Sequence, residues 1–218
     1  MARKSWDSYR FPIANDAAGE FLTHPIASNP LNGAWAPFHV PEDERTIPMA
    51  ESETRSLFIT GLRNAHAMEN EALSIMKPQL SRIENYPEVA TKLDQHIRET
   101  EGQIQRLENI LQQLGEDHSA FKDMGGKIMG AMAAMGHTVA PDEILKNSFA
   151  NFAFENFEIA AYKSLLTIAE LGGFPSAISG LEANLAEEQA MATWLDANLR
   201  GVTIKFASLK EAGETAKI

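Results

Sequence analysis

The segment Phe154–Tyr162, FENFEIAAY, raises the question that decides the fold of this chain. Wound into an α-helix at ~100° per residue, it places Glu155 and Glu158 on the side that also carries Ile159 and Leu165. Apolar residues at this spacing form the buried face of a helix, so that side should be dry. The segment therefore predicts a helix that directs two carboxylates into the protein core.

The composition of the chain excludes several classes of function. Its 218 residues suffice for one domain with a substantial core. The absence of cysteine excludes disulfides, thiolate metal sites and thiol catalysis, and it fits a reducing compartment. A net charge of -11 argues against a nucleic-acid partner, because phosphates attract Lys and Arg. We recognise no signal peptide and no membrane-spanning segment, so we expect a cytoplasmic protein without a membrane partner.

Apolar residues recur at helical spacing over most of the chain, and strand patterns are essentially absent. Short connections make each successive pair of helices an antiparallel hairpin, whereas the link between the two pairs is long. Two hairpins joined by one long crossover are typical of the ferritin-like four-helix bundle, so we predict an all-α protein of this class. The four helical patterns cover residues 52–83, 87–114, 141–172 and 175–199.

The two ends of the chain differ from the predicted bundle. Residues 1–50 hold most of the prolines, which disfavour helix, and we predict an extended arm there. The bundle is expected over residues 51–208, with Gly201 ending the fourth helix. Residues 209–218 are expected to form a frayed tail.

Further carboxylates lie on or near the apolar stripes of the other helices. Glu69 lies within the stripe of the first helix and Glu188 within that of the fourth. Glu99 lies at the edge of the second stripe, where His96 and Gln103 lie closer to its centre. In each of the four predicted helices, polar side chains therefore lie on or near the face that is expected to be buried.

The spacing of the glutamates brings them to one level of the bundle. Glu69 and Glu99 are 30 residues apart, and so are Glu158 and Glu188. The predicted turns lie close to halfway between the members of each pair. At ~1.5 Å per residue, the two carboxylates of each hairpin should therefore meet at the same height.

Buried carboxylates at one level cannot all stay ionised without a partner. They either take up protons or are neutralised by cations, and two divalent ions would balance four negative charges. Oxygen-rich sites with a few imidazoles suit iron or manganese, and facing glutamates build the di-metal sites of helical bundles. The alternatives are a network of ion pairs, to which Arg106 can contribute, and a contact with a neighbouring chain.

Two histidines accompany the predicted site. His66 precedes Glu69 by three residues, and His96 precedes Glu99 by three. Each can ligate the same metal, hydrogen-bond one of its ligands, or be an ordinary half-buried histidine. Ferritin-like sites carry Glu-x-x-His on two helices, whereas the helix with Glu188 has no imidazole. This departure reduces the number of strong ligands.

Five segments resemble, in order, the YciE/YciF-type ferritin-like stress proteins: LRNAHAMENEALSIM, IENYPE, QHIRETEGQIQRLENIL, FENFEIAAYKSLL and LAEEQAMATWL. The resemblance covers residues 55–207. It implies a four-helix bundle with a di-metal site, a dimer, and a link to bacterial stress responses. The metal-site residues to which it points are Glu69, His96, Glu99, Gln103, Glu155, Glu158 and Glu188.

Two functions remain open from the sequence. The first is a redox or metal-handling protein that holds two divalent ions per chain, iron first and manganese second, and oxidises Fe(II) or disposes of peroxide. Glu158 and Glu99 would then bridge or chelate the ions, with O₂ or peroxide as the small oxidant and Glu69 and Glu188 as capping ligands. The second is a non-catalytic structural or assembly protein with a degenerate site, which the missing imidazole beside Glu188 favours.

Overall fold

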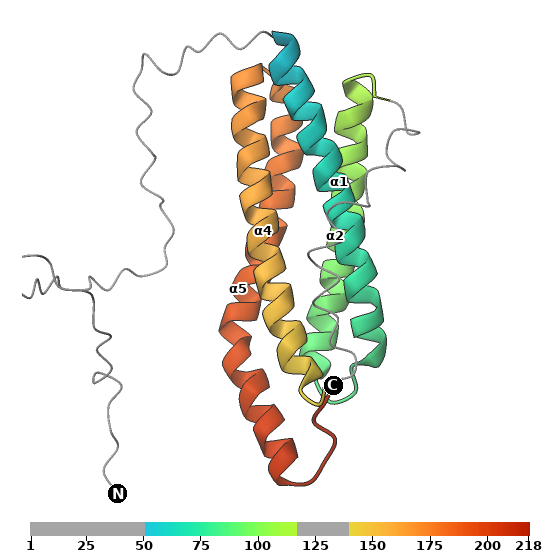
Figure 1. Cartoon of the computed structure of the whole chain (residues 1–218), viewed down its shortest axis with the longest axis vertical. Coiled ribbons are helices and arrows are strands. Elements are labelled where there is room, and N and C mark those ends of the chain that lie inside the picture. The colour runs from blue at the N-terminus through green and yellow to red at the C-terminus, as the bar shows by residue number, and fades with distance from the viewer. Residues whose placement is uncertain (1–50, 117–139) are drawn as a thin grey trace, which may run out of the picture. The chain divides into compact units, whose positions relative to one another are not determined.

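The computed structural model describes residues 51–116 and 140–218, and the predicted arm over residues 1–50 lies outside these ranges. The described chain forms four long helices, and within it there is no β-strand. None of these helices is long and apolar enough to cross a membrane. The all-α prediction is confirmed. Figure 1 shows the helices: α1 (Glu51–Arg82), α2 (Pro87–Gln113), α4 (Glu143–Gly172) and α5 (Pro175–Glu211).

Proline and glycine set the helix boundaries at both short turns. Pro87 and Pro175 lie in the first turns of α2 and α5, where a missing N–H costs no helical hydrogen bond. Gly173 follows α4 with a φ of 69°, a left-handed conformation that glycine adopts without steric penalty. Two hairpins with turns near residues 85 and 173 result, as the sequence predicts.

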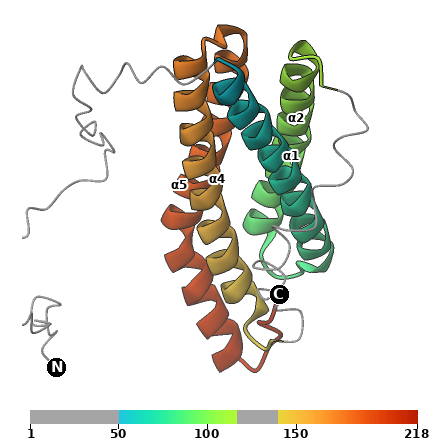
Figure 2. The ribbon, with the colours of Figure 1, turned by 45° about the horizontal axis from the view of Figure 1, so that its top comes forward.

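The packing of the two hairpins requires a long crossover. Helix α1 packs against α2 and α4, and α5 packs against the same two helices. Arg82, the last residue of α1, pairs with Glu143, the first of α4, at 2.7 Å, so these two helices are antiparallel. Helices α2 and α4 therefore run in the same direction on opposite corners of the bundle (Figures 1 and 2). This is the arrangement of a ferritin-like bundle.

Close apolar packing fixes α1 against α4 on one side of the bundle centre. A Cβ atom added to Gly61 would lie 2.7 Å from Cδ2 of Leu165, closer than van der Waals contact allows. Phe58 is fully buried and stacks on Phe174, with ring centroids 4.7 Å apart. This contact region lies on the α4–α5 turn side of Glu69, so the level of the glutamates is fixed by apolar contacts.

The C-terminal end differs from the prediction of a frayed tail after residue 208. Helix α5 continues through Gly201 to Glu211, because glycine inside a helix lowers its stability without ending it. Beyond the helix, the hydroxyl of Tyr86 donates to the carbonyl of Ala216 at 2.8 Å. The backbone N–H of Ile144 donates to the carbonyl of Lys217 at 2.8 Å. These bonds attach the end of the chain to the starts of α2 and α4.

Candidate metal centre

Four glutamates lie buried in the middle of the bundle. Glu69 comes from α1, Glu155 and Glu158 from α4, and Glu188 from α5, and each is at most 2% exposed. The carboxylates of this group interact electrostatically with one another across the helices. All four side chains therefore point into the bundle, as their positions on the apolar stripes predict.

Helix α2 contributes an imidazole to the same cluster. His96 is buried, and its Nε2 atom lies 3.2 Å from Oε2 of Glu155 and 3.5 Å from Oε2 of Glu188. One ligand atom from each of these three residues lies within 4.8 Å of the other two. Side chains from three helices thus converge on a volume that a single cation could occupy.

Glu99 lies behind this imidazole and outside the cluster. Its side chain is 23% exposed, and its Oε2 atom lies 3.2 Å from Nδ1 of His96. Gln95 donates to its other oxygen at 2.6 Å. A bridging role for Glu99 does not fit this position, because the α2 stripe is centred on His96 and Gln103. Burial raises the pKa of Glu99, but hydrogen bonds from Gln95 and His96 outweigh it and the net pKa is lowered.

The carboxylate of Glu99 also determines what His96 presents to the cluster. An ionised carboxylate only accepts hydrogen bonds, so its contact favours the tautomer with the proton on Nδ1. The lone pair of Nε2 then points toward Glu155 and Glu188. A carboxylate that orients a histidine in this way is the usual partner of a metal-ligating imidazole.

A hydrogen-bonded network holds the other side of the cluster. The hydroxyl of Tyr162 donates to Oε1 of Glu69, and the amide of Asn184 donates to the Tyr162 oxygen at 2.8 Å. The amide of Gln103 donates to Oε1 of Glu188 and, at 3.1 Å, to Glu187. Glu69 and Glu188 are therefore each fixed by a neutral donor.

Arg106 completes this network at the edge of the bundle. Its guanidinium donates to the side-chain oxygen of Asn184 and to the carboxylate of Glu187. Asn184 and Glu187 were not among the predicted site residues, although Asn184 lies four residues before Glu188 on the same helical face. A polar residue one turn from a buried carboxylate is the signal that could have identified it.

Several oxygens of the cluster have no hydrogen-bond partner among the described residues. They are Oε2 of Glu69, Glu155 and Glu188, Oε1 of Gln103, and both oxygens of Glu158. Buried polar atoms in folded proteins are nearly always paired. Carboxylate and amide oxygens with one imidazole are a donor set that suits iron or manganese. The residues present therefore fit a metal ion at this position.

Burial strongly disfavours the ionised forms of these glutamates. Burial, followed by the neighbouring carboxylates, raises the pKa of Glu69 and of Glu158 well above the ordinary value. It raises the pKa of Glu155 to about 8. Burial, with the adjacent Glu155, raises the pKa of Glu188 to about 9. Without a cation, the cluster is therefore held in part by protons.

His66 does not belong to the cluster. Its Nε2 atom lies 3.2 Å from Oε1 of Glu108 at the edge of the α1–α2 pair. Of the two histidines left open as ligands or hydrogen-bond partners, only His96 is placed among the buried glutamates.

Comparison with known proteins identifies relatives of this chain. A family model described as a domain of unknown function, DUF892, matches residues 53–208. Protein YciF of Escherichia coli strain K12 is 28% identical over 145 residues, which cover 62% of this chain and 82% of YciF.

Solved structures of two such relatives share the fold. A protein from Xanthomonas campestris is 30% identical, with a TM-score of 0.62 over 73% of this chain and 99% of its own. The stress protein YciF of Escherichia coli is 24% identical in the structural match, with a TM-score of 0.57 over 67% of this chain and 94% of its own.

Proposed function

The chain belongs to the DUF892 family, and from this premise we propose that it is a di-metal carboxylate protein of the bacterial stress response. The resemblance to YciE/YciF-type stress proteins drawn from its motifs is confirmed by the family match and by YciF itself. The ions we propose are iron first and manganese second, and the reaction is the oxidation of Fe(II) or the removal of peroxide.

The observation that carries this proposal is the set of buried oxygens without partners. Five carboxylate oxygens of Glu69, Glu155, Glu158 and Glu188 and the amide oxygen of Gln103 lack a hydrogen bond within the described chain. An unpaired buried polar atom costs about 1–3 kcal/mol, so a cluster of this kind is expected to have a ligand. Two divalent ions would balance the charge of four carboxylates.

The buried residues would have different roles at such a site. His96, held at Nδ1 by Glu99, would offer Nε2 as a ligand beside Glu155 and Glu188. Glu158, whose two oxygens lack partners, is the residue best suited to contact both ions. Tyr162 and Gln103 fix one oxygen each of Glu69 and Glu188 and leave the other oxygen for an ion. Iron or manganese bound there would supply the electrons that reduce O₂ or peroxide.

Metal content per chain tests this proposal. The protein is loaded anaerobically with Fe(II) or Mn(II), desalted, and measured by mass spectrometry beside Glu158→Ala and Glu188→Ala. Glu182→Ala is the matched control, because Glu182 is an exposed glutamate on α5. We expect about two ions per chain, lost in the two cluster variants and retained in the control. Wild-type protein without metal would refute the proposal.

A second function is favoured by a different observation. Tyr162 and Gln103 already donate to Glu69 and Glu188, and raised pKa values keep the glutamates protonated near neutral pH. A structural or assembly protein with a proton-filled, degenerate site would have the same core. Retention of no metal by the wild-type protein would favour this function.

We propose that the protein acts as a cytoplasmic homodimer. The absence of cysteine supports a reducing compartment. Phe149 and Phe157, about half exposed on α4, support an apolar contact between copies. Analytical ultracentrifugation of the wild type beside Phe149→Ser/Phe157→Ser tests this, with a shift toward monomer expected.

A further inference from the structure

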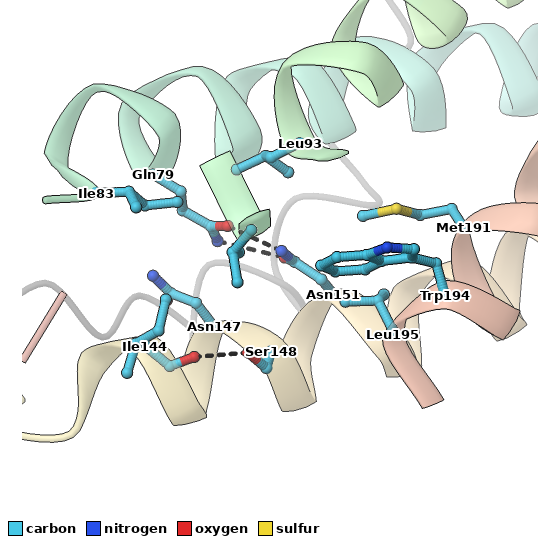
Figure 3. Close-up of a pocket in the computed structure, with 11 residues that line it drawn as sticks. Gln79, Ile83, Leu93, Ile144, Asn147, Ser148, Asn151, Met191, Trp194 and Leu195 are labelled. Carbon is cyan, nitrogen blue, oxygen red and sulfur yellow. Dashed lines mark hydrogen bonds between the residues drawn. The ribbon is translucent and has the colours of Figure 1, made fainter. Parts of the chain in front are cut away.

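A small chamber lies inside the bundle (Figure 3). Its position along the helices is one turn from the carboxylate cluster. Leu93 lines it three residues before His96, Asn151 four residues before Glu155, and Met191 three residues after Glu188. Residues three or four apart are neighbours on one face of a helix. Because α2 and α4 run opposite to α5, all three offsets lead toward the same end of the bundle. The chamber therefore adjoins the cluster along the bundle axis.

The lining of the chamber is uncharged and mostly apolar, and its four polar residues are Gln79, Asn147, Ser148 and Asn151. Gln79 and Asn151 exchange hydrogen bonds across it at 2.9 and 3.3 Å, as Figure 3 shows. Asn147 also lines it and is only 6% exposed. The chamber has room for about one water-sized molecule, with a volume of about 10 Å³. Such a space suits a small neutral molecule that both donates and accepts hydrogen bonds.

An outer groove of about 210 Å³ lies on the surface between the start of α2 and α5. The groove and the chamber share two lining residues, Val89 and Trp194. Trp194 is partly buried, and Figure 3 shows its ring beside Met191 on the chamber side. The two spaces are thus separated by the side chains that they have in common.

A glycine keeps the groove open. Gly201 lines it from inside α5, and a Cβ atom added there would meet nothing within 4 Å. Glycine lowers the stability of a helix interior relative to alanine, and no close packing at this position requires it. The missing side chain leaves this part of the groove open.

We propose that groove and chamber form one access path to the carboxylate cluster for small, uncharged, hydrogen-bonding molecules of the size of water and hydrogen peroxide. The path rests on the proposed function, since it leads to the site where peroxide would react. Trp194 and Val89 separate its two parts, the amide of Asn147 in the chamber lining binds the molecule, and Gly201 sets the width of the opening.

The test uses the full-length, metal-free protein and hydrogen peroxide as the probe. The thioether sulfur of methionine takes one oxygen atom from peroxide, the O–O bond breaks and water leaves, so that the sulfur is oxidised and the peroxide reduced. Met191 and Met68 are both 1% exposed, but Met191 lines the chamber and Met68 does not. Peptide mass spectrometry then gives the oxidation rate of each. We expect Met191 to be oxidised several-fold faster than Met68.

Two variants and a bulkier oxidant locate the path. Gly201→Leu adds a side chain at the groove whose Cβ atom would meet nothing within 4 Å, and Ala207→Leu adds similar bulk at an exposed position of α5 that does not line the groove. We expect Gly201→Leu to slow Met191 oxidation toward the rate of Met68, and Ala207→Leu to leave it unchanged. tert-Butyl hydroperoxide, too large for the chamber, should oxidise Met191 no faster than Met68.

Equal rates for Met191 and Met68 with hydrogen peroxide would overturn the path, and so would equal effects of the two leucine variants. Since no metal is present, these results do not depend on the metal content measured for the proposed function. If the protein binds metal but Met191 and Met68 are oxidised at equal rates, the access path is refuted and the proposed function stands. If Met191 is oxidised faster than Met68 but the protein retains no metal, the proposed function is refuted and the access path stands.

Discussion

The Nε2 atom of His96 lies 3.2 Å from Oε2 of Glu155, although their helices occupy opposite corners of the bundle. A contact between α2 and α4 must pass through the bundle centre, because α1 and α5 flank both helices. Glu188 of α5 lies 3.5 Å from the same nitrogen. The imidazole therefore marks the point where the hairpins meet, and a cation bound there would join both halves of the molecule.

The first prediction concerns His96 and its partner Glu99. We expect His96→Ala to remove metal binding, because the nitrogen that faces Glu155 and Glu188 is lost. Glu99→Ala should weaken metal affinity by about 10- to 100-fold, since it removes the carboxylate that orients the imidazole. Equilibrium titration with Mn(II) measures both. Equal losses in the two variants would instead make Glu99 a direct ligand, contrary to its position.

The second prediction concerns stability and pH in the metal-free protein. The pKa of Glu155 is raised to about 8 and that of Glu188 to about 9, from an ordinary value of 4.5. Below pH 4.5 both the folded and the unfolded chain are protonated at these groups. As pH rises, the unfolded chain releases the protons first, so unfolding is favoured until the folded pKa is passed. Each group should thus lower the free energy of unfolding by up to about 1.4 kcal/mol per pH unit within its window.

Urea unfolding between pH 5 and 9 measures this slope. The neutral variants Glu155→Gln and Glu188→Gln should each flatten it, whereas Glu182→Gln, at an exposed position, should not. A metal-free wild type whose stability rises over this interval would show that the glutamates are ionised in the folded state.

Much of the fold follows from local chemistry that a sequence displays. Apolar spacing, proline in the first turns and glycine at the end of α4 act within a few residues, and they place all four helices. The inward glutamates of α1, α4 and α5 follow from the same spacing. The end of α5 does not follow from local spacing. Gly201 lowers the stability of the helix, but favourable contacts beyond it can keep the chain helical. Its continuation depends on contacts with distant residues, such as Lys205 over the ring of Tyr86 at 5.5 Å.

The α2 side of the site was predicted less well for a related reason. Equal spacing from the turns assigns Glu99 to the level of the site, but the rotation of a helix about its axis decides which side chain faces inward. That rotation is set by packing, and it brings His96 and Gln103 to the centre. Asn184 and Glu187 were not predicted because their role depends on partners on other helices, Tyr162 and Arg106 among them.

The third prediction concerns the hydrogen bond from Tyr162 to Glu69. Both residues are fully buried, and Tyr162 also accepts from Asn184. Tyr162→Phe leaves a carboxyl oxygen and an amide without this partner, so we expect a loss of about 1–3 kcal/mol in the free energy of unfolding of the metal-free protein. Tyr86→Phe is a matched control for the loss of a tyrosine hydroxyl outside the cluster, and only Tyr162→Phe should also change metal affinity.

The fourth prediction concerns chelation. A metal that binds only the folded chain raises the melting temperature. Protein shown to be loaded should therefore melt at a lower temperature after treatment with a chelator, and Glu188→Ala should melt at the same temperature with and without it. A loaded wild type whose melting temperature is unchanged by chelation would argue for the structural alternative.

The last prediction concerns the end of the chain, where a frayed tail and a docked one lead to opposite results. Removal of residues 215–218 takes away the carbonyls that accept from Tyr86, Asn85 and Ile144. It also takes away Lys217, which pairs with the buried Glu143 at 3.1 Å. At about 0.5–1.5 kcal/mol for each hydrogen bond, we expect the free energy of unfolding to fall by several kcal/mol in urea titrations. Lys210→Ala, on the exposed last turn of α5, should change it little. A truncated protein as stable as the wild type would mean that the tail is frayed after all, and that Arg82 of α1 and Glu143 of α4 hold these two helices together without help from the tail.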